Sequence, residues 1–220
     1  MKLKKTLIVA SALVAGALTS NAATYSLFNV AGGPGVDTLW ANLDGSLMNG
    51  TGFVTMGYFA TNPLTTDIDT IAELVALKST FTSVQTATPG NSAAFTAPGF
   101  LAEDAAVVSS ITGSNALIGR KLYAIASNAS SLAAATELNA FSLFEVATIV
   151  DDVPFEQNYV ANPAGSTVII GEFGVYDDST GALGLGEGPY TTHKLAGVSE
   201  PSAAPLGAFG VLGLLRRRRI

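Results

Sequence analysis

Most of the chain between residues 23 and 196 follows the pattern of β-strands. Runs rich in β-branched and aromatic residues are bounded by Gly, Pro, Asn or Asp, which is typical of strands separated by turns. In Phe53–Phe59 apolar side chains fall at both odd and even positions, so we expect both faces of this strand to be buried, as inside a sandwich. The strongest runs are residues 24–30, 51–59, 121–127, 141–150 and 167–176.

Two segments favour helices. In residues 67–81 apolar side chains recur at helical spacing, and Thr70 with Glu73 fits a capping box near the start. Residues 131–139 contain Leu-Ala-Ala-Ala after a Ser N-cap and predict a second helix, barely two turns long. Residues 86–99, rich in Thr, Pro, Gly, Asn and Ser, predict a long exposed loop. The predicted fold is therefore mainly β, an antiparallel β-sandwich with one or two short helices, in preference to an α+β layer fold.

Composition supports a folded domain. The chain has 220 residues, of which 48% are hydrophobic and only 13% charged, whereas disorder requires low hydrophobicity and high net charge. It contains no Cys, which excludes disulfides, zinc–thiolate sites and thiol nucleophiles.

The positive charges lie mostly in the first and last segments of the chain. Between them, only four Lys and Arg residues oppose sixteen carboxylates, a formal charge of −12 against −6 for the whole chain. Nucleic-acid affinity comes from Lys and Arg that displace counterions, so this acidic middle argues against nucleic-acid binding.

Residues 1–22 have the features of a secretory signal peptide. Lys2, Lys4 and Lys5 precede an apolar run over residues 7–18, and Ser20-Asn21-Ala22 places small residues where signal peptidase inspects the chain. We expect cleavage between Ala22 and Ala23. The alternative is a retained anchor helix, but twelve residues cover only about 18 Å of a roughly 30 Å hydrocarbon core.

Residues 197–220 form a three-part segment. A polar stretch ends in Glu200-Pro201-Ser202, a thirteen-residue small and apolar run over residues 203–215 is broken by Pro and three Gly, and Arg216, Arg217, Arg218 and Arg219 follow. The run is short for a permanent membrane span, and the four arginines resist translocation and act as a cytoplasmic stop. This segment therefore predicts a transient membrane association.

These three parts, in this order, resemble a PEP-CTERM sorting signal. The resemblance covers about the last 23 residues, and Ser199 stands where the Pro-Glu-Pro motif has its first Pro. It implies that an exosortase, a membrane-embedded processing enzyme, recognises the motif and directs the protein to the outer surface or the exopolysaccharide matrix. The alternative is an ordinary short tail anchor.

Catalytic motifs are nearly absent. His193 is the sole His, no G-x-S-x-G elbow accompanies it, and we expect it to be solvated near the end of the domain rather than catalytic. A Ser-His-Asp triad and a His-based metal site are both disfavoured by this count. Asp151-Asp152 and Asp177-Asp178 do not match an EF-hand loop, and we interpret them as turn residues rather than Ca²⁺ ligands.

Two further features have both a structural and a functional interpretation. The glycine clusters at residues 32–35 and 184–188 fit no phosphate-binding loop and are interpreted as turns. Several aromatic residues are expected to pack in the core, with a sugar-stacking platform as the alternative; these are Trp40, Tyr58, Tyr123, Tyr159 and Tyr190.

The sequence predicts an exported, non-enzymatic surface or matrix protein. Residues 23–196 would form the β-sandwich domain, with an exosortase-type enzyme and extracellular polysaccharide as partners and with no cofactor or metal. The alternative is a secreted carbohydrate-active enzyme of the glycoside hydrolase type on the same sandwich. Two close carboxylates in a groove lined by an aromatic residue would favour that alternative.

Overall fold

The computed structural model describes residues 23–29, 38–61, 68–91, 96–101, 106–108, 115–150, 158–161, 166–184 and 186–197. The predicted signal peptide over residues 1–22, including Ala22, lies outside the described residues, and Ala23 is the first residue of the first strand. The predicted sorting motif and cytoplasmic stop also lie outside them; these are Ser199, Glu200, Pro201, Ser202, Arg216, Arg217, Arg218 and Arg219.

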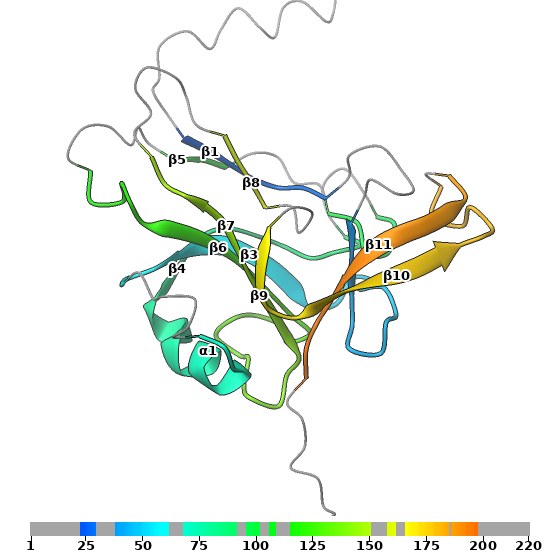
Figure 1. Ribbon diagram of the computed structural model, residues 1–220, viewed down its shortest axis with the longest axis horizontal. Coiled ribbons are helices and arrows are strands. Elements are labelled where there is room, and N and C mark those ends of the chain that lie inside the picture. The colour runs from blue at the N-terminus through cyan, green and yellow to red at the C-terminus, as the bar shows by residue number, and fades with distance from the viewer. Residues whose placement is uncertain are drawn as a thin grey trace, which may run out of the picture.

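The central layer is a five-stranded antiparallel sheet (Figure 1). Its strand order is β4-β3-β6-β7-β9. The strands are β4 (Phe81–Ala87), β3 (Phe53–Phe59), β6 (Lys121–Ser127), β7 (Phe141–Thr148) and β9 (Thr167–Ile170). β3 and β6 are buried along almost their whole length, as the apolar residues at both odd and even positions predicted.

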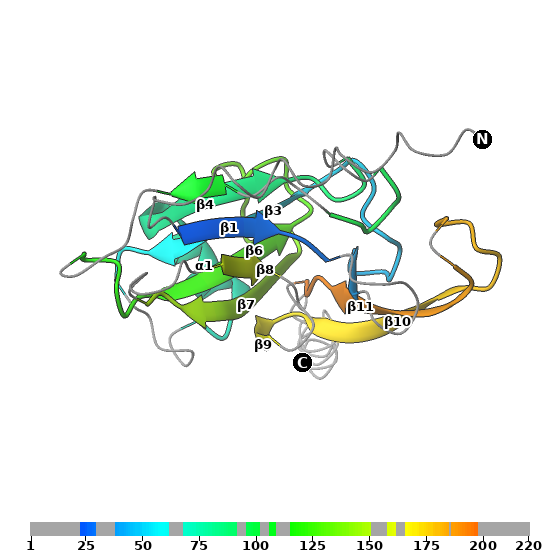
Figure 2. The same ribbon diagram turned by 90° about the horizontal axis from the view of Figure 1, so that it is seen from above.

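A second sheet covers one face of this layer. It has the order β5-β1-β8 and consists of β1 (Ala23–Leu27), β5 (Ala106–Val108) and β8 (Asn158–Ala161). In Figure 2 β1 and β8 lie across the strands of the central sheet. Tyr25 and Leu27 of β1 pack in one cluster with Val54 and Met56 of β3 and Phe144 of β7. This cluster is the interior of the sandwich.

A short helix covers the opposite face. α1 (Ile71–Leu77) begins at Thr70, whose hydroxyl accepts a hydrogen bond from the Glu73 amide, while the Glu73 carboxylate accepts one from the Thr70 amide. This is the predicted capping box. The 3₁₀ turn η2 (Lys78–Thr80) continues it. Ile71 and Leu74 pack against the second cluster, which includes Phe53, Phe59, Tyr123, Ile125 and Leu143 from the sheet.

A third sheet extends to one side of the central sheet (Figures 1 and 2). It has the order β10-β11-β2 and consists of β2 (Thr38–Ala41), β10 (Glu172–Asp178) and β11 (Gly188–Lys194). A small cluster of Leu39, Phe100, Leu183 and Tyr190 lies against it. One link to the central layer is the bridge between Phe141 and Ala196, whose backbones exchange two hydrogen bonds.

The mainly β, sandwich-like fold is thus confirmed. Six of the eight strand pairs are antiparallel, and β1 with β8 and β11 with β2 are parallel. The predicted exposed loop over residues 86–99 is wrong in part, because β4 reaches Ala87 and the segment buries Pro89, Gly90 and Gly99.

The predicted helix over residues 131–139 is wrong, because these residues form turns. The Lys78 ammonium, from the end of the first helical segment, donates hydrogen bonds to the carbonyls of Ala133 (3.0 Å) and Ala135. In a helix the Ala135 carbonyl would accept from the Asn139 amide. That amide instead bonds the Thr136 carbonyl, and the Asn139 side chain accepts from the Thr136 amide. Tertiary and side-chain bonds therefore replace the helical ones.

The predicted single strand over residues 167–176 is two strands in different sheets. The chain turns at Gly171, which has φ +108°, a conformation that favours glycine. A Cβ there would lie 2.8 Å from the Lys194 carbonyl oxygen and 3.0 Å from His193 Nε2. Gly171 therefore allows β9 to end in the central sheet and β10 to start in the third sheet, paired with β11.

We predict that Leu74→Ala destabilises the protein by about 3 kcal/mol, because Leu74 is fully buried between α1 and the sheet. Chemical denaturation monitored by circular dichroism measures this free energy of unfolding. Leu138→Ala is the matched control, since Leu138 is 95% exposed and its truncation should change stability by less than about 0.5 kcal/mol. Equal losses in the two variants would contradict the assigned packing of α1.

Candidate functional site

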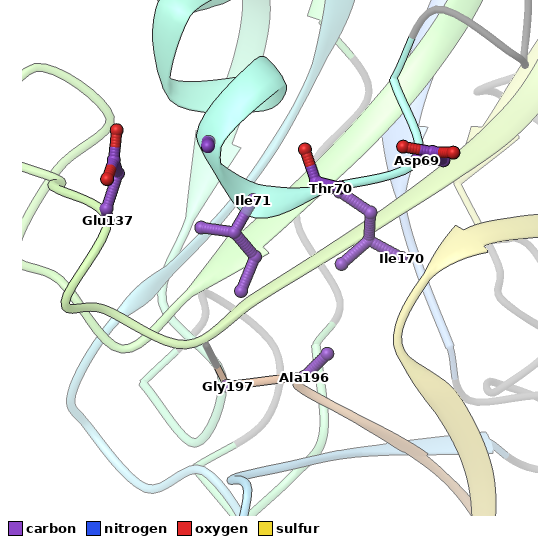
Figure 3. Close-up of a pocket in the computed structure, with 8 residues that line it drawn as sticks. Asp69, Thr70, Ile71, Glu137, Ile170, Ala196 and Gly197 are labelled. Atoms are coloured by element: carbon purple, nitrogen blue, oxygen red, sulfur yellow. The ribbon is translucent and has the colours of Figure 1, made fainter. Parts of the chain in front are cut away.

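The structure offers two clefts and one buried polar pair as candidate sites. The first cleft has a volume of about 350 Å³. It lies between the start of α1, the turn at Glu137 and the segment of Ala196 and Gly197 that follows β11 (Figure 3). Asp69 and Glu137 lie on opposite walls, and Ile71 and Ile170 provide apolar surface between them. A glycoside hydrolase requires two carboxylates in one groove, so this acidic cleft is where that alternative can be tested.

Asp69, which lines this cleft, interacts with its neighbour Glu73 at the start of α1. Glu73 accepts hydrogen bonds from the amides of Asp69 and Thr70 and from the Thr70 hydroxyl, and the last of these contributes most to lowering its pKa. The neighbouring Glu73 carboxyl raises the pKa of Asp69, through a side-chain hydrogen bond and charge repulsion. No aromatic residue is among the described residues that line the cleft. These interactions account for the shifted carboxyls without a catalytic role.

The second cleft is a groove of about 310 Å³ over the edge of the central sheet, and its described lining carries no charge. We call it the hydroxyl groove, because most of its lining residues are Ser or Thr. Its residues are Phe53, Thr55, Ser83, Thr86, Ala87, Thr88, Ser130, Ser131 and Leu132.

Strand register creates the floor of the hydroxyl groove. Thr86 lies directly opposite Thr55, and their hydroxyl oxygens are 2.7 Å apart, while Thr55 also donates to the Gln85 carbonyl at 3.0 Å. Ser83 lies opposite Gly57 on the same face. The side chains of Ser83, Thr88 and Ser130 have no hydrogen-bond partner among the described residues, so their hydroxyls can donate to and accept from a ligand.

The wall of the hydroxyl groove is held rigidly. Lys78 ties the 131–135 segment to the end of η2 through its two carbonyl bonds. The Asn128 side chain accepts hydrogen bonds from the Ala140 amide (3.0 Å) and the Asn139 side chain (3.2 Å), which closes the base of the same loop. The groove is therefore formed before any ligand arrives, which lowers the entropic cost of binding.

Sequence reasoning missed this groove. Its signal is the Ser- and Thr-rich stretch over residues 82–88, which was assigned in part to a loop. Only the register between β3 and β4 shows which of these hydroxyls share a face.

The expectation that His193 is solvated is wrong. It lies on β11 with no exposed surface, and its ring packs against Trp40, Phe144 and Phe173 at centroid distances of 5.3, 5.5 and 5.3 Å. Burial lowers its pKa to about 4, and a weaker contact with the Ile170 backbone opposes this shift. His193 is therefore neutral at pH 7, inside the junction between the third and central sheets.

His193 Nε2 is hydrogen-bonded to the Ser142 hydroxyl of β7, which gives the chain a Ser-His pair. The pair lacks the rest of a hydrolytic site. Ser142 is buried, and His193 Nδ1 has no hydrogen-bond partner in the described structure, so no carboxylate orients the ring. The neighbouring Trp40 indole nitrogen is likewise buried without a partner. The arrangement is a polar contact between two sheets and not a nucleophile with its base.

The four cations of the domain are all bound within it. Lys121 pairs with Glu145 at 2.6 Å and Lys194 with Glu172 at 2.8 Å, and the second pair lowers the pKa of Glu172. Arg120 donates to the carbonyls of Phe59, Ala60 and Ala116, and Lys78 is bound as described above. These cations are used internally, which leaves a surface dominated by carboxylates.

The aromatic residues listed as platform candidates pack mostly in the core. Trp40, Tyr123 and Tyr190 are 0–1% exposed, and Tyr159 stacks on Tyr25 at a centroid distance of 5.3 Å. Tyr58 is half-buried beneath the Arg120 guanidinium, 6.0 Å from its ring centroid. Core packing is thus confirmed for the buried four.

The turn interpretation of the acidic pairs and glycine clusters is confirmed at Asp178 and Gly184, whereas Asp177 lies within β10 and Gly188 begins β11. The Asp178 carboxylate accepts hydrogen bonds from the amides of Ala182 and Leu183, both at 2.9 Å, which confirms its turn role. Asp151-Asp152 and the glycines of residues 32–35 lie outside the described residues. Within the described ranges, no group of three or more His, Cys, Asp and Glu is placed to hold a metal ion. No helix within them has the length and hydrophobicity to span a membrane.

Comparison with protein-family models, with curated proteins and with solved structures found no match to this chain.

We predict that the free energy of unfolding falls by about 3 kcal/mol between pH 6.5 and pH 4 because of His193. The folded pKa lies below the ordinary value of 6.5, so the unfolded chain takes up the proton first as the pH falls. The contribution of neutral His193 to the free energy of unfolding is therefore fully present above pH 6.5 and is lost as the pH falls toward 4. Denaturant titrations at several pH values measure the slope.

His193→Gln is the control for this pH dependence, because Gln offers a hydrogen-bonding side chain that does not titrate. The difference in slope between the two proteins isolates His193 from the carboxylates. An unchanged slope in the variant would show that His193 is not the buried neutral group described here.

Proposed function

We propose that this protein is an exported, non-enzymatic surface or matrix protein that binds neutral segments of an extracellular polysaccharide in the hydroxyl groove. The observation that carries the binding half is the lining of that groove, which combines six Ser and Thr residues with three apolar residues and includes no charged residue. Sorting to the surface is proposed from the sequence of residues 198–219.

The chemistry of the hydroxyl groove favours a neutral sugar chain. Hydroxyls both donate and accept hydrogen bonds, which matches the alternating donors and acceptors of a saccharide. A phosphate or uronate would find no cation among the described lining residues, and all four cations of the domain already bind its own carbonyls or carboxylates. Phe53, Ala87 and Leu132 offer apolar contact for the C–H face of a sugar ring.

The sorting half rests on the resemblance to PEP-CTERM signals. Glu200-Pro201-Ser202, the apolar run after it and Arg216–Arg219 supply the recognition motif, the membrane segment and the cytoplasmic stop, in that order. An exosortase-type enzyme is the proposed partner at the membrane. Export across the inner membrane precedes this step, through the proposed signal peptide over residues 1–22.

A glycoside hydrolase remains the alternative, and the acidic cleft is the feature that favours it. Asp69 and Glu137 lie on opposite walls of this cleft, and the neighbouring Glu73 carboxyl raises the pKa of Asp69, which is the direction a general acid needs. Hydrolysis of a polysaccharide that is lost in both Asp69→Asn and Glu137→Gln would establish this alternative and overturn the non-enzymatic proposal.

We predict that the combined change Ser83→Ala and Thr88→Val weakens binding of a neutral glucan about tenfold, since two hydroxyl hydrogen bonds of roughly 0.5–1.5 kcal/mol each are lost. Isothermal titration calorimetry on the full chain measures this, with dextran as the probe and alginate as a charged comparison. Thr82→Val is the matched control, because Thr82 lies opposite Tyr58, on the other face of β4. Binding of alginate in preference to dextran would contradict a neutral-sugar groove.

We predict that changing Arg216, Arg217, Arg218 and Arg219 to Ser impairs membrane retention and processing, because the cytoplasmic stop is lost. Cell fractionation and intact mass in the native host provide the measurement. The same four positions changed to Lys should behave as the original protein, since Lys keeps the charge. Glu200→Ala with Pro201→Ala tests the motif separately, and normal processing of that variant would refute recognition by an exosortase-type enzyme.

A further inference from the structure

β10 is an edge strand of the sheet that extends from the side of the molecule. The strand order β10-β11-β2 leaves one side of β10 without a neighbouring strand among the described residues, and Figures 1 and 2 show the β10-β11 hairpin reaching away from the central sheet. All seven residues of β10 pair with β11 in continuous register, with no bulge. Its outward amide and carbonyl groups are thus a regular template for another strand.

The same strand exposes two large apolar side chains. Phe173 is 48% exposed and Val175 is 74% exposed, and their spacing of two places them on one face of the sheet. β10 also lacks the Lys, Arg and Pro residues with which edge strands commonly block pairing. By contrast, the edge strand β4 exposes Thr82, Ser83 and Thr86. An apolar edge in an otherwise well-packed domain points to a protein partner.

The charges on β10 restrict how a second strand can approach. Glu172 is paired with Lys194 of β11 at 2.8 Å, which neutralises it. The Asp178 carboxylate is buried and bound by turn amides. Asp177 is exposed, and within the described residues its carboxylate forms no such ion pair or turn hydrogen bond. A favourable register therefore keeps Asp177 away from the apolar side chains and keeps carboxylates away from one another.

We propose that a second copy of this chain pairs with β10 in an antiparallel arrangement whose two-fold axis passes through Gly174. In this register Phe173 lies opposite Val175 of the second copy, and Val175 lies opposite its Phe173. Glu172 lies opposite Tyr176 of the second copy. Five residues of each strand pair, both exposed apolar residues gain an apolar partner, and Asp177 falls beyond the paired segment.

Neighbouring registers are less favourable. With the two-fold axis through Val175, Phe173 lies opposite Asp177 of the second copy and Glu172 lies opposite its Asp178. An aromatic ring would then face a carboxylate, and two carboxylates would face each other. An axis through Phe173 extends pairing into Gly171, where the chain has already turned toward the central sheet. Only the axis at Gly174 pairs the apolar side chains with each other and stays within the strand.

The resulting dimer is a closed, two-fold assembly with a continuous sheet in the order β2-β11-β10-β10-β11-β2. Such an isologous contact uses each β10 edge once and does not propagate into a fibre. The proposal rests on the edge strand alone, so it holds or fails independently of saccharide binding and of sorting.

Site-specific disulfide formation tests both the dimer and its register. The natural chain has no Cys, so only introduced thiols react. Phe173→Cys and Val175→Cys are made separately in the full chain, one with a mass tag, mixed under reducing conditions and then oxidised. Directly opposed residues on antiparallel strands lie within disulfide reach. We expect the mixed disulfide to be the dominant product.

The other outcomes of this experiment overturn the proposal. Self-crosslinking of Val175→Cys alone indicates the axis at Val175, and self-crosslinking of Phe173→Cys alone indicates the axis at Phe173. Absence of crosslinks in every mixture indicates that β10 does not pair with itself.

Light scattering on the full chain gives a second readout. Val175→Lys should lower the dimer fraction at least tenfold, because a charge replaces the central apolar contact. Val160→Lys is the matched control, since Val160 is 39% exposed on β8, in a different sheet, and should leave the dimer intact. Both changes are at exposed positions, so the fold should persist. Equal dimer fractions in the two variants would overturn the role of β10.

Discussion

The structure depends on a sheet whose two faces must both be covered. β3 and β6 carry apolar residues on both sides, so the five-stranded sheet needs a layer above and a layer below. The β5-β1-β8 sheet supplies one layer, and α1 with the 129–140 segment supplies the other. Burial of apolar surface on two faces is the dominant favourable term in such an arrangement. The first cleft lies beside the start of α1, and the hydroxyl groove lies beside residues 130–132 of the second covering segment.

The third sheet joins this body at one crowded corner. Gly171 brings the chain from β9 into β10, directly above the Ser142-His193 contact, while the Phe141-Ala196 bridge fixes the end of β11. His193 tolerates burial because it stays neutral, and aromatic rings surround it. These contacts join the base of the β10-β11 hairpin to the central sheet, while β10 keeps one edge without a neighbouring strand among the described residues.

The distribution of charges in the domain indicates which surfaces are available to bind a partner. A domain with four cations and sixteen carboxylates uses its positive charges to bind its own carbonyls and acids. On the described part of the surface, the hydroxyl groove is uncharged, and Phe173 and Val175 form an apolar edge. Each of these regions suits a different kind of partner, because the first offers hydrogen bonds and the second offers backbone pairing with apolar contact.

The sequence by itself determined the features that depend on neighbours along the chain. Alternating and doubly apolar runs located β3, β6 and β7, and Thr70 with Glu73 marked the start of α1, because strand faces and helix caps are local. Tertiary structure decided the rest. Lys78 donates hydrogen bonds to carbonyls 55 and 57 residues away, in a segment that forms turns instead of the predicted second helix. Gly171 divides one apolar run between two sheets, and His193 of β11 is buried in the core. These outcomes depend on contacts between segments that are far apart in the sequence, and a local residue pattern does not specify such contacts.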